Sequence, residues 1–576
     1  MTETRRQKWT GVCLLSGLAL ALSLWGGTPF EQLDSLIPRA KMAMENGGDP
    51  GFFHYPALVI YLTAIPYSIL DWMLGDEGVA ELTRASRRNF DAPFFSYYFP
   101  GHLLSAGFGL LGVLSVRAAA LTLFRDSKVA FAAGAILATS LLWISDTHML
   151  TVDVPLAALL ILTAERTLRV LCREAPLSVR AAVIPGLCAG LATAAKYNGA
   201  LILVPLTIAL VLHARRYGGR ILVALFVPGA VAVATFLLSN PYVLLDFEAF
   251  RTDFLFEWKH SSMGHAGYIV ENGYAYHLFS SLGSGLGWPG LIAAAVGVVL
   301  LLRTRSVPTS AKVLLIGFPL LHYALIGNSK LAFARYMLPM LPFLALAASA
   351  VIRQLGTRLN RRGIASLATI IAVVAPGLMW GIKHDRLLAK PDIRRELVLA
   401  LAKADLDLGG EPVYAFGHSG LCARWAKLPF RRKNLIATPN IGLNATRLYI
   451  FDSFSQERVL YENPGPELEQ YYPGNENVQL FENYASLSVV QVSPFNVPKA
   501  DVPLSRKSLY SPFLPDLRVR ERAGPFFELC FTQADDADRF ETACRELGIK
   551  VVRTTGTGGW YFNRLRELAE KRQAPN

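Results

Sequence analysis

Residues 221–239 read ILVALFVPGAVAVATFLLS, without a single charged side chain. An α-helix of about 20 apolar residues is long enough to cross the hydrocarbon core of a bilayer, so this stretch predicts a transmembrane helix. Ten further apolar runs of comparable length lie at about 10–26, 98–123, 128–145, 153–171, 181–195, 198–214, 284–302, 312–328, 332–352 and 363–383. Together they predict a polytopic α-helical membrane protein with about eleven transmembrane helices, the first of them uncleaved.

The apolar runs end near Lys383, and the character of the chain changes there. Over the whole chain 52% of residues are hydrophobic and 18% are charged, a balance unusual for a soluble protein. From His384 onward, charged and apolar residues mix as they do in a water-soluble domain. We therefore expect a membrane domain at 1–384, with outer loops at 28–97 and 240–283, and a soluble domain at 385–576.

The soluble part combines the patterns of strands and helices. Runs rich in β-branched and aromatic residues predict strands, whereas longer amphipathic runs predict helices. Strands are expected at 412–416, 447–451, 486–492, 526–531 and 550–553, and helices at 394–406 and 534–547. This alternation predicts an α/β fold.

The placement of Lys and Arg predicts the orientation in the membrane. Short cytoplasmic loops of membrane proteins are enriched in these residues. Here every second loop is basic, through Arg125 and Lys128; Arg173 and Arg180; Arg215, Arg216 and Arg220; Arg303, Arg305 and Lys312; Arg353, Arg358, Arg361 and Arg362. We therefore expect a cytoplasmic N-terminus and an extracytoplasmic C-terminal domain, as in a multi-pass protein of a bacterial inner membrane.

Two further conclusions follow from the charge pattern. Residues 56–74 are also apolar, but counting them as a span would invert the side of every later basic loop. We expect this segment to lie along the outer membrane interface as an amphipathic helix. The net charge of +13 arises largely from short basic loops rather than from a basic and aromatic patch, so the sequence does not indicate a nucleic-acid partner.

Three cations break the rule for short outer loops. Lys196 lies in the turn at 193–198, and Lys330 and Arg335 lie in the segment at 328–339. They are either basic side chains that snorkel to lipid headgroups or the lining of a cationic pocket for a lipid-linked phosphate. Guanidinium binds phosphate oxygens in pairs and ammonium adds a point charge, which favours the pocket.

Acids lie at the same predicted depth. Asp34 follows the first helix, and Asp146 and Asp153 flank His148. A carboxylate at a membrane boundary is costly unless it is paired or catalytic. A simpler interpretation exists for Asp153, as a first-turn acid that favours the helix starting before Pro155.

Short motifs along the membrane domain resemble the GT-C superfamily of polyprenyl-phosphate-sugar-dependent glycosyltransferases, near the bacterial lipid A aminoarabinose transferases and the protein O-mannosyltransferases. The motifs are Asp34, GDPGFFHYPAL at 48–58, Asp153, GLATAAKYN at 190–198, NPY at 240–242 and RYMLP at 335–339. The resemblance covers about 9–383 and not the soluble domain. Where the O-mannosyltransferases commonly have an Asp-Glu pair, this chain has Asp34-Ser35.

The resemblance implies transfer of a hexosyl or pentosyl group from a lipid-phosphate donor to an acceptor hydroxyl outside the cytoplasm, with inversion. An attacking hydroxyl needs a general base, and the departing phosphate needs preplaced cations. We expect Asp34 to be the general base and Asp153 to be a second catalytic residue. Lys196 and Arg335 are expected to bind the phosphate, with Lys330 behind them. Possible substrate-binding residues are His54, Tyr55, Asp146, His148 and Tyr336.

Other functions and partners stay open at this stage. A membrane transporter, or a non-catalytic envelope-assembly protein with an outer binding domain, is the alternative. The sequence contains no recognisable metal-ligand spacing or cofactor motif, since His260, His265 and His277 match no metal signature. A divalent metal requirement, the sugar and the acceptor (lipid, glycan or protein) are not determined by the sequence. Membrane lipid and a polyprenyl-phosphate sugar are the expected partners.

Overall fold

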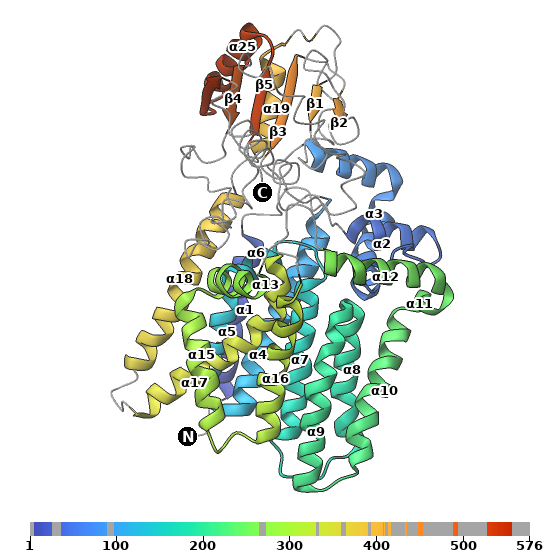
Figure 1. Ribbon diagram of the computed structural model, residues 1–576, viewed down its shortest axis with the longest axis vertical. Helices are drawn as coiled ribbons and strands as arrows, with labels where there is room; N and C mark the ends of the chain where they lie inside the picture. The colour runs from blue at the N-terminus through green and yellow to red at the C-terminus, as the bar shows by residue number, and fades with distance from the viewer. Residues whose placement is uncertain are drawn as a thin grey trace, which may run out of the picture.

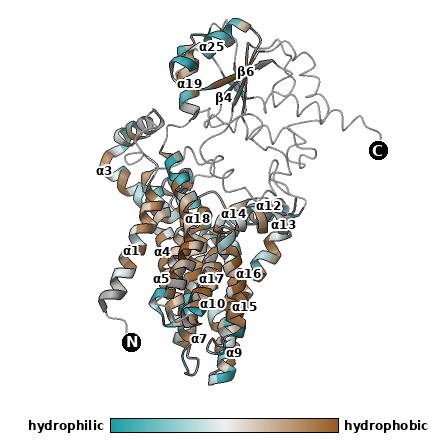
Figure 2. Ribbon diagram, turned by 90° about the vertical axis from the view of Figure 1, so that its left-hand side faces the viewer, coloured by the Kyte–Doolittle hydropathy of each residue, from teal (hydrophilic) through white to brown (hydrophobic). Residues whose placement is uncertain are grey.

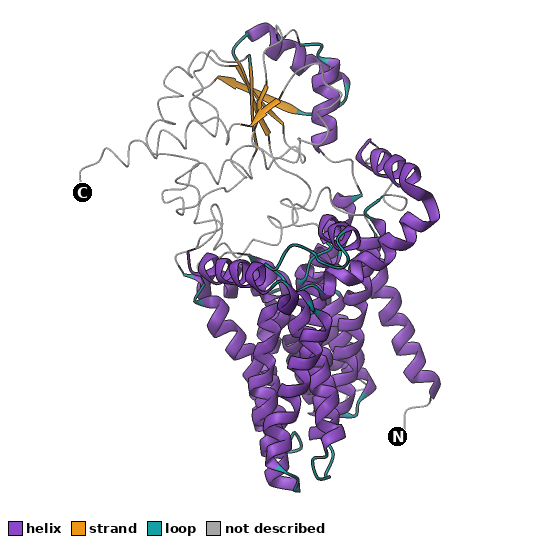
Figure 3. Cartoon of the chain, turned by 90° about the vertical axis from the view of Figure 1, so that its right-hand side faces the viewer, coloured by secondary structure: helices purple, strands orange, loops and turns teal. Residues whose placement is uncertain are grey.

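The computed structural model describes residues 5–25, 36–88, 97–263, 272–329, 333–358, 364–389, 393–406, 408, 413–415, 432–434, 447–452, 488–492 and 527–555. Figure 1 shows a bundle of long helices with a small sheet and two helices beyond one end of it. In Figure 3 the strands are confined to that end, and the bundle consists of helices joined by loops.

The bundle is built from helices that coincide with the predicted apolar runs. Its helical segments are α1 (Arg5–Leu24), α4 (Phe99–Phe124), α5 (Ser127–Ala138), α6 (Leu141–Thr147), α7 (Asp153–Leu171), α8 (Val179–Ala195), η1 (Tyr197–Ile202), α9 (Leu203–Tyr217), α10 (Ile221–Ser239), α15 (Trp288–Arg303), α16 (Thr309–Gly327), η3 (Ala334–Met340), α17 (Leu341–Arg358) and α18 (Ile364–Leu388). Further helical elements complete one end: α2 (Leu36–Glu45), α3 (Leu58–Arg88), α11 (Tyr242–Leu245), α12 (Phe247–Met263), α13 (Gly273–Tyr276), η2 (His277–Leu282) and α14 (Gly283–Leu286).

The polytopic helical architecture is confirmed, but the number of eleven spans is not established. Among the described residues, 7 helices are long and apolar enough to cross a membrane, or up to 9 if each of two bent pairs is one span. One bent pair is α5 with α6, which meet at 62°. Helices α1 and α8 are apolar but shorter, and α7 carries several charged residues, including Glu165 and Arg169. Length and composition alone therefore do not fix the count.

Helix α3 contains the segment predicted to lie along the interface. Figure 2 shows it at the end of the bundle that faces the sheet, where it packs on α2. Residues Leu58–Thr83 also satisfy the length and apolarity of a span, and a kink at Gly75, with φ of 64°, interrupts the helix. Large apolar side chains such as Ile69 and Trp72 are exposed on α3, as expected for contact with lipid. Its interfacial orientation stays a prediction.

Small residues allow the bundle helices to pack closely. A Cβ atom added at Gly297 of α15 would lie 1.9 Å from the carbonyl oxygen of Ala347 in α17, so the two backbones touch at this point. Close approach at small residues is typical of helices packed within membranes. The core of the bundle is correspondingly rich in buried alanines, among them Ala119, Ala157 and Ala348.

The C-terminal part forms a mixed sheet of order β2-β1-β3-β5-β4-β6. The strands are β1 (Val413–Ala415), β2 (Arg432–Asn434), β3 (Leu448–Asp452), β4 (Ser488–Val492), β5 (Phe527–Phe531) and β6 (Val551–Thr555). Strand β1 pairs in parallel with β2 and β3, and the remaining pairs are antiparallel. Helices α19 (Ile393–Lys403) and α25 (Ala534–Glu546) contribute to a core separate from that of the bundle, with Leu397, Phe531 and Phe540 buried in it. Sequence periodicity predicted this α/β character but missed β2.

Candidate functional site

Three elements of the bundle meet at the start of α7. Asp153 is the first residue of that helix. Lys196 follows α8 in an extended conformation, with φ of −157° and ψ of 137°, and turns the chain into η1. The turn requires a glycine at position 199, because an added Cβ would lie 2.4 Å from the Ala192 carbonyl oxygen. Arg335 lies in the first turn of η3.

The three side chains form a linked ion-pair cluster. Lys196 Nζ donates to Asp153 Oδ1 at 2.7 Å, and Arg335 Nε lies 3.6 Å from Asp153 Oδ2. The Asp153 side chain is 4% exposed, whereas those of Lys196 and Arg335 are 15% and 19% exposed. One buried carboxylate therefore contacts two more accessible cations. We call Asp153, Lys196 and Arg335 the cation cluster.

Aromatic rings surround the cations. Lys196 Nζ lies 4.5 Å from the ring centroid of Tyr336 and 5.8 Å from that of Tyr55, and Arg335 Cζ lies 4.7 Å from the Phe333 ring. Cations at such distances are attracted to the faces of aromatic rings. The structure thus brings the predicted residues Tyr55 and Tyr336 to the cation cluster.

A buried histidine supports the same segment. Nε2 of His322, in α16, lies 2.8 Å from the Tyr336 carbonyl oxygen and donates to it, since a carbonyl can only accept. The His322 side chain is buried and holds η3 against α16. Sequence reasoning missed this residue, because a lone histidine in an apolar helix has no distinguishing pattern.

The loop before α3 is fixed to α12. Asp253 Oδ2 accepts from the Phe53 backbone N–H at 2.8 Å, and His54 Nδ1 lies 2.9 Å from Glu257 Oε1. The hydrogen bond to Glu257 raises the pKa of His54 above its usual value, and the charge of Asp253 adds to the effect, while burial opposes it. His54 therefore contacts α12, whereas its neighbour Tyr55 faces Lys196.

The NPY motif at 240–242 holds the same loop. The Asn240 side-chain oxygen accepts from the Ala57 backbone N–H, and the Tyr242 hydroxyl donates to the Gly47 carbonyl oxygen at 2.8 Å. The Tyr197 hydroxyl, next to Lys196, donates to the Phe53 carbonyl oxygen at 2.8 Å. Motifs that are far apart in sequence are therefore joined in the structure, since each of them bonds to the loop that carries Tyr55.

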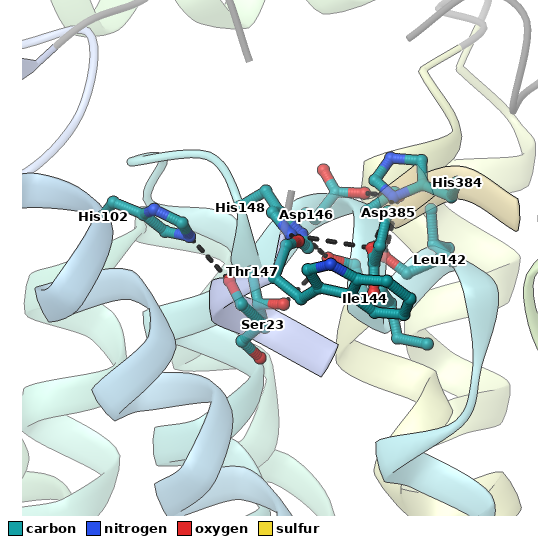
Figure 4. A network of polar contacts seen from close by, with 11 residues as sticks. Ser23, His102, Leu142, Ile144, Asp146, Thr147, His148, His384 and Asp385 are labelled. Carbon is teal, nitrogen blue, oxygen red and sulfur yellow. Dashed lines mark hydrogen bonds and ion pairs between the residues drawn. The ribbon is translucent and has the colours of Figure 1, made fainter. Parts of the chain in front are cut away.

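Asp146 and His148 belong to a different, buried network (Figure 4). Asp146 Oδ2 accepts from the Ser145 hydroxyl at 3.0 Å. His148 Nε2 lies 3.6 Å from Asp385 Oδ1, and His384 Nδ1 lies 3.0 Å from the same oxygen. The sequence showed no metal-ligand spacing, but His148, His384 and Asp385 lie close enough together to hold a metal ion. Sequence spacing could not reveal this set, because α18 brings two of its members back to α6.

Two of the predicted site residues cannot be placed. Asp34, the expected general base, and Lys330, the third expected phosphate ligand, lie outside the described residues. Their roles stay predictions, as do those assigned to the cation cluster.

Residues 93–240 match a family model, dolichyl-phosphate-mannose-protein mannosyltransferase. This range contains Asp153 and Lys196 of the cation cluster. No curated protein is similar enough in sequence to count as a relative.

Solved structures provide a second comparison. ArnT from Cupriavidus metallidurans in the apo state is 14% identical, with a TM-score of 0.51 over 78% of this chain and 93% of that chain. The same protein bound to undecaprenyl phosphate is 14% identical, with a TM-score of 0.49 over 78% of this chain and 94% of that chain. The archaeal oligosaccharyltransferase AglB from Archaeoglobus fulgidus, with an inhibitory peptide and a dolichol-phosphate, is 12% identical, with a TM-score of 0.47 over 89% of this chain and 78% of that chain.

The likeness to apo ArnT shows a shared fold. Together with the family match, it confirms the predicted resemblance to the GT-C glycosyltransferases.

Proposed function

We propose that this protein is an integral membrane glycosyltransferase that transfers a sugar from a polyprenyl-phosphate-linked donor to an acceptor hydroxyl on the extracytoplasmic side. The observation that carries the proposal is the convergence of Lys196 and Arg335, from separate elements, on one buried carboxylate. The family match supports the reaction class, since its description names a dolichyl-phosphate donor.

The cation cluster suits a lipid-linked phosphate. The cluster places two cations beside one carboxylate, and positive charge in a largely buried site attracts an anion. Both cations are partly exposed, and a guanidinium such as that of Arg335 can bind phosphate oxygens in pairs. As the sugar–phosphate bond breaks, negative charge grows on the phosphate, and preplaced cations stabilise that charge without reorganising.

Asp153 is better suited to positioning the cations than to proton transfer. Each of its oxygens faces a cation, and the side chain is buried. With both oxygens turned toward cations, the carboxylate orients those cations rather than meeting an acceptor hydroxyl. In this proposal the general base is Asp34 alone.

The reaction is a single displacement. The Asp34 carboxylate takes the proton of the acceptor hydroxyl, and the acceptor oxygen forms a bond to the anomeric carbon of the sugar. The bond between that carbon and the phosphate oxygen breaks, and its electron pair leaves with polyprenyl phosphate. Attack opposite to the leaving group gives inversion at the anomeric carbon. The rings of Tyr55 and Tyr336 lie beside Lys196, and they are the proposed contacts to the donor head.

A comparison of cell envelopes tests the proposal. Mass spectrometry of lipids, glycans and glycoproteins is carried out on cells with the wild-type protein, without the protein and with Asp34→Asn. We expect one sugar modification to depend on the protein and to fall by roughly a hundredfold or more in Asp34→Asn, the scale of losing a general base. Because amide replaces carboxylate at almost the same size, the variant should accumulate normally in the membrane.

Two outcomes would contradict the proposal. If all three strains carry the same envelope sugars, the protein is no glycosyltransferase of the envelope. If the modification requires the protein but is unchanged in Asp34→Asn, Asp34 is dispensable, as a non-catalytic assembly protein would predict.

A further inference from the structure

A second cluster of polar side chains lies in the bundle, apart from the cation cluster. It joins His148, which directly follows α6, with His384 and Asp385 near the end of α18. Their ligand atoms lie within 4.8 Å of one another, and all three side chains are buried. Figure 4 shows these side chains converging from the two helices.

Close helix packing fixes this arrangement. An added Cβ at Gly377 of α18 would lie 2.3 Å from the Thr139 carbonyl oxygen, and one at Gly381 would lie 2.4 Å from Ile144 Cδ1. Glycines four residues apart let two helices approach closely. His384 and Asp385 follow within about one turn of Gly381, which sets them against the end of α6. The cluster therefore rests on a packed helix pair rather than on flexible side chains.

The distances suit a four-coordinate transition metal. Asp385 Oδ1 lies 3.6 Å from His148 Nε2 and 3.0 Å from His384 Nδ1. Ligands bound tetrahedrally at about 2.0–2.2 Å are about 3.3–3.6 Å apart, so small shifts would bring these atoms into a coordination shell. Two imidazoles and one carboxylate are ligands that zinc accepts, whereas calcium and magnesium prefer oxygen alone.

The hydrogen bonds of His148 point to a cation at Nε2. Its Nδ1 lies 2.8 Å from the Ile144 carbonyl oxygen, and its Nε2 lies 2.9 Å from the Trp25 carbonyl oxygen. A carbonyl only accepts, and a neutral imidazole has a single N–H. If Nδ1 donates to Ile144, Nε2 faces an oxygen with its lone pair, an unfavourable contact that a metal bound by Nε2 would relieve. A backbone carbonyl that fixes the tautomer is typical of metal-bound histidines.

Asp385 provides an independent indication. Its side chain is 0% exposed, and within the described part of the chain its Oδ2 has no hydrogen-bond partner. An ionised carboxylate buried without full compensation is strongly destabilising. A divalent cation bound between Asp385 and the two imidazoles would supply that compensation.

We propose that His148, His384 and Asp385 bind a divalent transition metal of the zinc class, which fastens the end of α18 to the end of α6. The metal would link the last membrane helix, and hence the entry to the C-terminal domain, to the segment that leads into Asp153. The proposal does not depend on the glycosyltransferase reaction, and its test uses no substrate.

The test measures metal in the full-length protein, purified in detergent without a histidine tag. Plasma mass spectrometry should find about one equivalent more metal in the wild type than in Asp385→Asn, a variant of almost unchanged size. After chelation, titration with Co²⁺ should give the visible absorption of a low-symmetry nitrogen and oxygen site. His384→Ala should bind Co²⁺ roughly a hundredfold more weakly, since it loses a direct ligand. Zn²⁺ should raise the unfolding temperature of the wild type and of neither variant.

His102→Ala is the matched control. The His102 ring centroid lies 5.3 Å from that of His148, but its Nε2 contacts the Ser23 carbonyl oxygen instead of the cluster. This variant should retain the metal and the Co²⁺ spectrum. A wild-type protein that binds neither ion would overturn the proposal and leave a protonated His148 as the explanation of its contacts. Equal Co²⁺ affinity in wild type, Asp385→Asn and His384→Ala would overturn it as well. The Co²⁺ titration of the wild-type protein tests the proposal even if a variant fails to fold.

Discussion

At the scale of single residues, the cation cluster combines charge with shielding. Asp153 is buried beneath two partly exposed cations, and aromatic rings flank both of them. Aromatic rings in place of water beside a charge lower the local dielectric, so they would strengthen the field of the cations on the proposed anion. A basic side chain that merely snorkels to lipid headgroups would not need a buried carboxylate partner. The contacts therefore favour a built anion site over snorkelling.

The proposed role of the cations predicts the behaviour of Lys196→Ala and Arg335→Ala. A hydrogen bond to a charged group contributes about 1.5–3 kcal/mol, equal to about 10- to 150-fold in affinity. Each variant should therefore bind the donor about 10- to 150-fold more weakly. Single-turnover rates should also fall, because the same charges act on the transition state. Donor affinity by equilibrium binding and quenched single-turnover assays measure the two effects.

Lys312→Ala is the control for this pair. Lys312 Nζ donates to the Leu302 carbonyl oxygen in a loop predicted to be cytoplasmic, so donor affinity should be unchanged. Wild-type donor affinity in both Lys196→Ala and Arg335→Ala would exclude the phosphate role.

At the scale of elements, the loop at 47–57 is fixed to α12 and to the segment that precedes it. Three backbone groups of the loop, at Gly47, Phe53 and Ala57, bond to side chains from the segment 240–253. His54 adds the ion pair with Glu257 of α12. The loop is therefore attached by polar contacts as well as by apolar packing, and the ion pair of His54 makes part of this attachment sensitive to pH.

The raised pKa of His54 predicts how that attachment changes with pH. A pKa raised by folding means that the ion pairs stabilise the folded protein fully below the unfolded value of about 6.5, and that this contribution is lost as pH rises through the folded pKa. The unfolding temperature of the wild type should exceed that of His54→Gln at about pH 5.5, and the gap should narrow toward about pH 9. Thermal unfolding across this range measures the gap.

The partner variant Glu257→Gln serves as a check on the cause. It removes the main contact that raises the pKa, so it should show the same reduced dependence on pH as His54→Gln. If the difference in unfolding temperature between wild type and His54→Gln stays constant across this pH range, His54 acts through packing alone.

At the scale of the whole molecule, the cation cluster and the C-terminal sheet can act in one reaction only if they lie on the same side of the membrane. Alternation of basic loops predicts that both the cation cluster and the C-terminal domain are extracytoplasmic. Figure 1 agrees in one respect, since the sheet lies beyond one end of the bundle and the turn between α9 and α10 lies at the other.

Reporter fusions test this topology. A fusion at Gly218, in the basic turn after α9, should give the cytoplasmic signal, and a fusion at Gly410 should give the extracytoplasmic signal. The reason is that Arg215, Arg216 and Arg220 retain their loop inside. Alkaline phosphatase and green fluorescent protein fusions report the two compartments in opposite ways. The same signal at both sites would refute the predicted topology and, with it, the extracytoplasmic reaction.

The sequence by itself determined the elements, because hydrophobic runs and short periodic patterns are local properties of the chain. Continuous apolar stretches such as 221–239 are expected to be helices in a membrane, since a helix satisfies its backbone hydrogen bonds within one segment. Strands such as β5 followed from their own composition, and Lys196 and Arg335 stood out because their charge conflicts with their predicted depth. The number of spans could not be predicted from the sequence. Each bent helix pair can be counted as one span or as none, and the apolar part of α3 is long enough to span although it was predicted to lie along the interface.

Only the tertiary structure decided which of these side chains meet. Asp153 and Lys196 are 43 residues apart in sequence, yet their side chains are hydrogen-bonded. His148 lies close to His384 and Asp385, although most of the bundle's helices lie between them in the sequence. Such contacts depend on which helices pack together and at what rotation, and no local pattern encodes that. Packing at small residues such as Gly381 sets the rotation of α18 against α6, and with it the position of the two side chains that follow.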